Sequence, residues 1–182
     1  MKDLVATSGS ESFLNLVYKA SLFKEQNRTL SEGDISMKTA DIMTKQIHTI
    51  GPDQTLKECA EILKKHHVNG LVVVEGETVV GVITKADIFK AILPSYSDIM
   101  EDEHPIVSFE YLEERAHKLY DLTVRALMGT PPITITGDTP VVKAGSLMIL
   151  RRIKQLPVVD NGRLSGIITL TDIINYITEK IK

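Results

Sequence analysis

The sequence has 182 residues, of which 43% are hydrophobic and 25% charged, so it has enough apolar content to bury a core without disulfides or metal. The formal net charge of −3 gives no basic excess that would point to nucleic acid as a partner, and the single cysteine excludes a disulfide framework within the chain. No apolar run approaches the ~20 residues that a membrane-spanning helix needs. The first ten residues lack the layout of a secretory signal, so we expect a cytoplasmic protein without membrane contact.

Residues 1–38 are expected to form an N-terminal extension with one amphipathic helix. Apolar residues recur at helical spacing within Glu11–Lys24, and the segment from Leu30 to Lys38 has the composition of a loop. We interpret the helix as one that docks on its own domain or on a twin subunit. A binding arm for another protein is the alternative.

The chain then contains one sequence segment twice. When the sequence is shifted by 85 residues, 43–93 align without gaps on 128–178, with 13 identities in 51 positions. Chance would give about three identities at average residue usage. The identities also cluster at corresponding apolar and turn positions. We therefore infer a duplication, with a first repeat at 39–93 and a second repeat at 123–182.

Each repeat is predicted to fold in the order β-α-β-β-α. The first copy gives strands at 47–50, 70–74 and 78–83, with helices from Thr55 to about His66 and at 85–93. The second copy gives strands at 133–136, 156–159 and 163–168, a helix that opens with Thr139-Pro140, and a helix at 170–180. A lone unit of this size would expose one apolar face. The expected fold is therefore α+β (α/β), with tandem repeats packed as a pseudo-twofold pair.

Residues 94–122 are expected to form an acidic and helical linker between the repeats. It begins at Pro94 and carries the acidic run 101–103. Ser108 could cap a helix that presents one apolar face, made of Phe109, Leu112, Ala116 and Leu119. We expect this helix to pack on the pair.

The most informative motif is a Thr-x-x-Asp sequence where the last strand of each repeat meets its last helix. It reads Thr84 to Asp87 in the first copy and Thr169 to Asp172 in the second, each time after a glycine and two apolar residues. The threonine and the acid suit a helix N-terminus as capping groups. The same carboxylate could accept hydrogen bonds from vicinal ribose hydroxyls, with phosphate near the threonine. The two interpretations are compatible.

The repeated unit resembles the CBS domain, the family named for cystathionine β-synthase. The resemblance depends on the tandem arrangement, on the Thr-x-x-Asp ends and on the strand that follows the first helix of each copy. That strand is Leu156 to Asp160 in the second repeat and Leu71 to Glu75 in the first, where Val72 stands at the family's usual proline. Residues 40–44 and 124–128 look like the short lead-in segments of the family, so the resemblance covers about 39–93 and 123–178.

The resemblance implies two clefts between the repeats, which in this family commonly bind AMP, ADP, ATP or S-adenosylmethionine as regulatory ligands, with no required cofactor. Asp87 and Asp172 would hold ribose, with Thr84 and Thr169 near ribose or phosphate. Apolar side chains and backbone groups would enclose adenine, from Ile47, His48, Val68, Asn69, Leu71, Pro132, Ile133, Ile153, Lys154 and Leu156.

Cationic residues distinguish the two predicted clefts. They are Lys85, Arg151, Arg152 and Lys154, and the other copy has Leu170, His66, His67 and Asn69 at the equivalent positions. Arg151 and Arg152 are phosphate candidates, and a solvated helix end is the alternative explanation for both. We therefore expect unequal clefts and at most one strong site for a charged nucleotide.

Three functions are to be compared for a chain with these features. The first is a stand-alone regulatory protein that binds an adenosine-containing ligand between its repeats and signals to a protein partner in trans. The second is a homodimeric scaffold with vestigial clefts, because the helix after Pro140 is apolar over more than one face. The third is an enzyme, which we do not expect because the sequence offers no nucleophile arrangement, no Gly-rich phosphate loop and no metal-ligand set.

Overall fold

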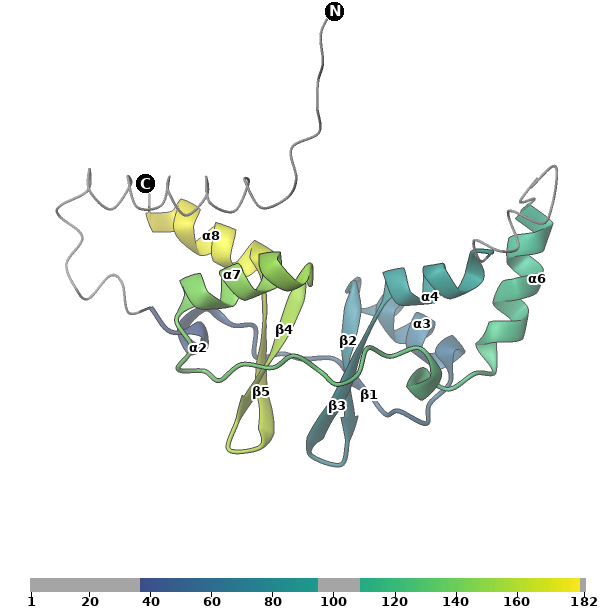
Figure 1. The fold of residues 1–182 in the computed structure, drawn as a ribbon, viewed down its shortest axis with the longest axis horizontal. Coiled ribbons are helices and arrows are strands. Elements are labelled where there is room, and N and C mark those ends of the chain that lie inside the picture. Colours follow the sequence, from purple (N-terminus) through teal and green to yellow (C-terminus); the bar gives the residue numbers. More distant parts are fainter. Residues whose placement is uncertain (1–36, 95–108, 181–182) are drawn as a thin grey trace, which may run out of the picture. The chain divides into compact units, whose positions relative to one another are not determined.

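The computed structural model describes residues 37–94 and 109–180. The predicted helix at Glu11–Lys24 and the predicted cap Ser108 lie outside the described residues. The elements of the first repeat and linker are α2 (Thr39–Ile42), β1 (Thr49–Ile50), α3 (Leu56–Lys65), β2 (Gly70–Glu75), β3 (Thr78–Thr84), α4 (Lys85–Ile92) and α6 (Phe109–Tyr120). Those of the second repeat are η2 (Val124–Ala126), α7 (Val141–Arg151), β4 (Gln155–Asp160), β5 (Arg163–Thr169) and α8 (Leu170–Lys180) (Figure 1).

The two repeats build one small sheet each. In the first, β1 runs parallel to β2, and β2 pairs antiparallel with β3; in the second, β4 pairs antiparallel with β5. Strands β3 and β5 contact each other, so the sheets of the two repeats meet through these strands. The predicted mixed fold of tandem repeats is confirmed.

The first strand of each repeat is shorter than the prediction. Strand β1 has two residues, and in the second repeat only Ile135 pairs, in an isolated parallel bridge with Val158. Pro157 of β4 stands at the position of Val72, which pairs with Thr49 of β1, and it has no N–H group to donate to the predicted strand. The sequence pattern therefore overestimated this strand.

Helix α3 covers the sheet of the first repeat with one apolar face. Leu56, Cys59 and Leu63 on this face are buried, as their spacing predicts. Thr55 caps the helix, because its Oγ1 accepts a hydrogen bond from Glu58 N at 3.2 Å. The core of the first repeat consists of Ile50, Leu56, Cys59, Leu63, Leu71, Val73, Ile83 and Val124.

Helix α7 is the counterpart of α3, but it begins differently from the prediction. Pro140 is its N-cap rather than its first helical residue, and it offers no side-chain cap. The hydroxyl of Thr139 instead accepts a hydrogen bond from Thr136 N at 3.2 Å. Thr139 thus stabilises the turn before the helix rather than the helix itself.

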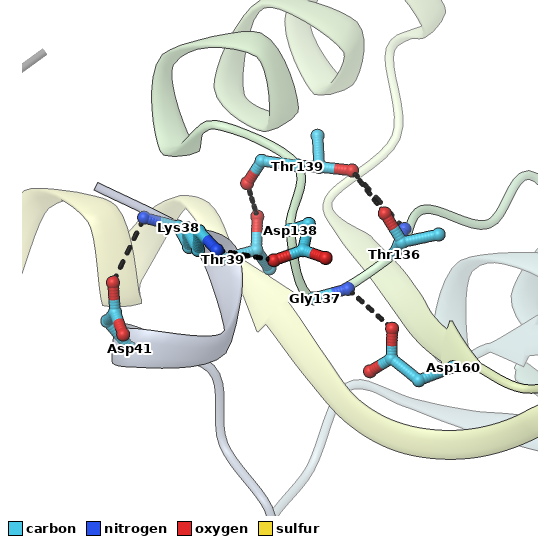
Figure 2. Close-up of polar contacts among 8 residues, drawn as sticks. All are labelled: Lys38, Thr39, Asp41, Thr136, Gly137, Asp138, Thr139 and Asp160. Atoms are coloured by element: carbon cyan, nitrogen blue, oxygen red, sulfur yellow. Dashed lines mark hydrogen bonds and ion pairs between the residues drawn. The ribbon is translucent and has the colours of Figure 1, made fainter. Parts of the chain in front are cut away.

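The lead-in segment of each repeat packs on the other repeat. Figure 2 shows how the first lead-in meets the second repeat at the start of α7. Thr39 is fully buried, and both its N and its Oγ1 donate to Thr139 O, at 2.8 and 2.7 Å. Lys38 Nζ forms an ion pair with Asp138 Oδ1 at 2.7 Å. Gly137 N donates to Asp160 Oδ1 at 2.9 Å, which connects this turn to the end of β4.

The second lead-in makes the equivalent contacts with the first repeat. Val124 in η2 is fully buried in the core of that repeat. Arg125 binds two acids of the first repeat, Asp53 at 3.1 Å and Glu75 at 2.7 Å. The two repeats are therefore joined by an exchange of segments as well as by their strands.

Replacing Thr39 by valine is expected to lower the free energy of unfolding by about 1 kcal/mol, which is the usual net value of one hydrogen bond. Valine keeps the shape of the buried side chain, and Thr139 O still accepts from the backbone N of residue 39. Urea unfolding measures the loss. The same change at the exposed Thr49 is the control and should stay within about 0.5 kcal/mol of the wild type.

The linker helix α6 packs on the first repeat, against α3 and α4. Leu119 contacts the core of that repeat, and Leu112 and Ala116 are half-buried, as the spacing predicts. Phe109 does not belong to this face, because it is 73% exposed at the first position of the helix.

Candidate functional site

The candidate site begins at the junction of β3 and α4, where Thr84 and Asp87 form a capping box. Thr84 Oγ1 accepts a hydrogen bond from Asp87 N at 3.3 Å. Asp87 Oδ2 accepts two hydrogen bonds in return, from Thr84 N at 2.9 Å and from Thr84 Oγ1 at 2.6 Å. These bonds fix the carboxylate at the N-terminus of α4, where the helix dipole favours a negative charge.

The second repeat has the same arrangement at the junction of β5 and α8. Asp172 Oδ2 accepts from Thr169 N and from Thr169 Oγ1, both at 2.7 Å. The two junctions differ at the other carboxylate oxygen. Asp172 Oδ1 is contacted by the hydroxyl of Thr44 at 3.5 Å, whereas Asp87 Oδ1 makes no hydrogen bond with the residues that the structure describes. The position equivalent to Thr44 is Gly129, which has no side chain to offer.

Asp87 lines a cleft of about 680 Å³ whose walls come from both repeats. This volume lies within the ~300–1,000 Å³ of small-molecule sites. The first repeat supplies the end of β3, the start of α4 and Asn69. The second repeat supplies the segment 129–133, which follows its lead-in, and the residues from the end of α7 to the start of β4. The lining residues are Asn69, Val82, Thr84, Lys85, Ala86, Asp87, Lys90, Gly129, Thr130, Pro131, Pro132, Ile133, Arg152, Ile153, Lys154 and Gln155.

The structure brings together nine of the residues that the sequence analysis predicts to bind the ligand. These are Asn69, Thr84, Lys85, Asp87, Pro132, Ile133, Arg152, Ile153 and Lys154. Sequence reasoning missed Lys90 and Gln155. Lys90 could have been found, because it follows Asp87 by three residues on α4 and so lies on the same side of the helix. No sequence pattern around Gln155 indicates a binding site, because only the packing of the second repeat against the first brings this residue to the cleft.

The remaining nominated residues lie elsewhere. Leu71 and Leu156 are fully buried, so their side chains belong to the cores rather than to a cleft wall, and Val68 packs against the core of the first repeat. Arg151 ends α7 and does not line the cleft at Asp87. The other nominated residues occupy the positions that correspond to this cleft around Asp172, namely Ile47, His48, Thr169 and Asp172.

Two histidines stack beside the first repeat. The rings of His48 and His66 lie 3.7 Å apart between centroids, with an interplanar angle of 24°. The pKa of His66 is lowered from its usual 6.5, first by desolvation and then by repulsion from His48 and Lys65. Protonation of His66 therefore opposes the stacked arrangement.

Because of this stack, we expect the protein to be less stable in acid. Because the folded state binds the His66 proton less readily than the unfolded chain does, the stabilising contribution is present above pH 6.5 and is lost as the pH falls through the lowered pKa. Thermal melts at pH 7.5 and 5.5 should show a fall in Tm that is smaller in the His66→Gln variant. His67→Asn, which removes a neighbouring imidazole outside the stack, should keep the wild-type fall. An equal fall in all three proteins would contradict the assignment.

Other reactive groups lie apart from the cleft. Cys59 is fully buried, and burial raises the pKa of its thiol to about 11, so the thiol is protonated at neutral pH. Within 37–94 and 109–180, no cluster of three or more His, Cys, Asp or Glu residues has a geometry that could hold a metal ion. No helix in these ranges has the length and apolar content to cross a membrane.

The fold and the cleft define a pair of tandem repeats with a ligand-sized cleft between them. The model of the CBS domain family matches residues 40–94 and 124–179, which together make up more than half of the chain. The chain therefore belongs to the CBS domain family.

Relatives of known sequence are similar over most of this chain. A CBS domain-containing protein of Dictyostelium discoideum is 30% identical over 143 residues, which cover 78% of this chain and 91% of that protein. The CBS domain-containing protein YhcV of Bacillus subtilis is 29% identical over 73% of this chain and 80% of its own length. An uncharacterized protein of Methanocaldococcus jannaschii is 29% identical over 78% of this chain, which spans only 32% of that longer protein.

Solved structures of CBS pairs are also similar to this chain. CBSX2 of Arabidopsis thaliana, in complex with AMP, has a TM-score of 0.62 and 26% identity, over 80% of this chain and 98% of that chain. The CBS domain pair of protein MJ0100, in complex with 5′-methylthioadenosine and S-adenosyl-L-methionine, has a TM-score of 0.60 and 28% identity, over 79% of this chain and 97% of that chain.

Proposed function

We propose that the pair of repeats is a regulatory module that binds an adenosine-containing ligand in the cleft at Asp87. The observation that carries the proposal is the state of the Asp87 carboxylate. One oxygen is held by the capping box, and the other makes no hydrogen bond with the described part of the chain. A carboxylate fixed in this way, on the wall of a cleft of suitable size, can accept hydrogen bonds from the two hydroxyls of a ribose.

The other walls of the cleft suit the rest of a nucleoside. Val82, Pro132, Ile133 and Ile153 offer apolar surface for the faces of a purine. The similar proteins support this class of ligand, because the CBSX2 structure contains AMP, and the structure of the MJ0100 pair contains 5′-methylthioadenosine and S-adenosyl-L-methionine. The ligand would be regulatory rather than a cofactor, and the module would not itself be an enzyme.

The proposed signal is a change in how the two repeats are held together. The ligand would contact α4 of the first repeat and the segment between α7 and β4 of the second, so its binding favours arrangements in which both walls are in contact with it. A protein partner in trans that prefers one arrangement would then bind with an affinity that depends on the ligand. We propose 39–93 and 123–182 as the regulatory pair, with 1–38 as an extension and 94–122 as the linker.

Calorimetric titration of the full chain with AMP, ADP, ATP, S-adenosylmethionine and adenosine tests the proposal. We expect at least one of them to bind with a dissociation constant below 1 mM and to raise Tm progressively as its concentration increases. Guanosine nucleotides are the control for the base. If no adenosine compound releases heat or shifts Tm at millimolar concentration, the proposal is overturned.

A homodimeric scaffold is the second candidate, and one observation favours it. The outer face of α7 exposes Val142, Ile149 and Leu150 by 76, 60 and 66%. The equivalent residues of α3 in the first repeat are all lysines, Lys57, Lys64 and Lys65. An apolar face on one copy alone is typical of a surface that another chain covers.

Sedimentation velocity distinguishes the scaffold from a monomeric sensor. The scaffold predicts a dimer whose sedimentation coefficient is unaffected by adenosine compounds. The variant Ile149→Lys/Leu150→Lys, which gives α7 the residues of α3, should then sediment as a monomer. A wild-type chain that is monomeric at all concentrations would contradict the scaffold and leave the regulatory proposal intact.

A further inference from the structure

We infer that the cleft at Asp87 selects a nucleoside polyphosphate, such as a di- or triphosphate, over a monophosphate or a sulfonium nucleoside. This inference rests on the proposed function, because it assigns the charged part of the ligand within the same cleft. It depends on four cationic side chains that line the cleft, Lys85, Lys90, Arg152 and Lys154, which face one carboxylate, Asp87.

The four cationic side chains are unpaired in the described part of the chain. None of their side chains forms an ion pair or a hydrogen bond with residues 37–94 or 109–180. The chain as a whole carries a net charge of −3, so the positive lining is a local feature and not a consequence of composition. A cleft lined mainly by one sign of charge concentrates ligands of the opposite sign.

The duplicated unit provides an internal comparison. At the four equivalent positions around Asp172, the chain has Leu170, Asn175, His67 and Asn69. None of these is a permanent cation, although the backbone of both repeats follows the same course. By the same correspondence, Lys154 takes the place of Asn69 around Asp172, and Lys45 takes the place of Thr130. The fold therefore does not need Lys85, Lys90 and Arg152, whose equivalents are uncharged at neutral pH, and the presence of these three cations at the Asp87 cleft points to a ligand.

Lys85 is the most informative of the four. It is the first residue of α4, where the positive end of the helix dipole disfavours a cation. Arg152 and Lys90 lie near the C-terminal ends of α7 and α4, where the dipole favours them without any ligand. A helix-end effect can therefore account for Lys90 and Arg152, but it cannot account for Lys85. An anion bound beside the N-terminus of α4 does account for Lys85.

The placement of the charges favours a chain of phosphates over a single one. Lys85 and Lys90 are five residues apart on α4, about 7.5 Å along its axis at the usual rise of a helix. Arg152 and Lys154 lie on the opposite repeat, between α7 and β4. Each added phosphate brings further negative charge to these groups, whereas the positive sulfonium of S-adenosylmethionine would be repelled by them. A polyphosphate could then contact both repeats at once.

The experiment exchanges the residues of the two clefts. In Lys85→Leu/Arg152→His, each cation is replaced by the residue that the other repeat carries, so the fold already accommodates both side chains. Lys143→Asn, which removes an exposed cation of α7 outside the cleft, is the control for the change of charge. Calorimetry with ATP, ADP, AMP, adenosine and S-adenosylmethionine is carried out in buffer with EDTA. Inorganic tripolyphosphate is added as a probe that carries charge without the nucleoside.

We expect affinity to fall in the order ATP, ADP, AMP and adenosine, and to weaken as salt rises. The cleft variant should lose at least tenfold in ATP affinity with little change for adenosine, and Lys143→Asn should bind like the wild type. The inference is overturned if AMP binds as tightly as ATP, or if the cleft variant keeps the ATP affinity; the proposed function then survives on the binding of AMP or adenosine.

If no adenosine compound binds, the proposed function fails, and tripolyphosphate decides what is left. Its binding to the wild type, lost in the cleft variant, would support an anion-selective cleft for a ligand without adenosine. No binding of tripolyphosphate would overturn the inference as well. Urea unfolding of each variant identifies a loss of fold, and Leu170→Lys then serves as the reverse test, because it should create weak ATP binding at Asp172.

Discussion

Asp87→Asn is expected to weaken binding of an adenosine ligand in its cleft by about 10- to 100-fold, which corresponds to the ~1.5–3 kcal/mol of hydrogen bonds to a charged group. An asparagine can keep one oxygen as the acceptor for Thr84 N, so the helix cap is largely retained. It cannot accept at its second position, because an amide nitrogen donates. The variant therefore removes the group that would bind ribose while the capping group remains.

Asp172→Asn is the matched control for this variant. It changes an identical capping box in the second repeat, so the two variants should lose similar stability, about 0.3–1 kcal/mol for one charge at a helix N-terminus. Only Asp87→Asn should weaken the binding of a charged nucleotide strongly. Equal losses of affinity in both variants, measured by calorimetry, would show that the effect comes from the fold. The assignment of ribose to Asp87 would then be wrong.

The second large effect is expected at Gly81, where Ala should destabilise the protein by about 1–3 kcal/mol, the usual cost of overpacking. A methyl group there would lie 2.7 Å from Met128 Sδ and 3.1 Å from Gly129 O. The methionine side chain could move, but the carbonyl could not move easily, because it accepts a hydrogen bond from Val82 N at 3.2 Å. Urea unfolding measures the loss.

Gly166 is the equivalent glycine in the second repeat and provides the comparison. There the three nearest atoms to an added methyl group all belong to the side chain of Met43. We therefore expect Met43→Ala to relieve the effect of Gly166→Ala almost completely, whereas Met128→Ala should relieve Gly81→Ala only in part. Double-mutant cycles separate the two cases. Equal relief at both glycines would contradict the role given to the backbone of Gly129.

The sequence predicted the elements well wherever the determining contacts are local. The duplication, the two hairpins and the capping boxes at Thr84 and Thr169 depend on residues that are close along the chain, and the structure has all of them. The start of α7 was predicted less well. Threonine is a common capping residue, but the hydroxyl of Thr139 accepts a hydrogen bond from the preceding turn. Its carbonyl accepts a hydrogen bond from Thr39, one hundred residues away.

The candidate site was also predicted only in part, because some of its residues are brought together by contacts between distant parts of the chain. The motif located Asp87 and its neighbours on α4, and the comparison of repeats identified Lys85, Arg152 and Lys154. The sequence could not show which repeat a lead-in segment contacts, because the contacts of the first lead-in lie about one hundred residues further along the chain. The contacts of Thr39 and of Val124 show which repeat each lead-in contacts, and Pro132 and Ile133, which follow the second lead-in, line the cleft at Asp87.

The reciprocal placement of the lead-in segments has a consequence for how the molecule can be divided. The lead-in segment at the start of each repeat packs on the other repeat. An isolated repeat would therefore keep a lead-in with nothing to pack on, and it would expose the apolar surface that the other lead-in normally covers. Val124 belongs to such a lead-in, and it fills the interior formed around Leu56 and Cys59. Neither half should therefore fold by itself. Two copies of the same half could instead complete one another in a symmetric dimer, in which each copy supplies the lead-in segment that the other lacks.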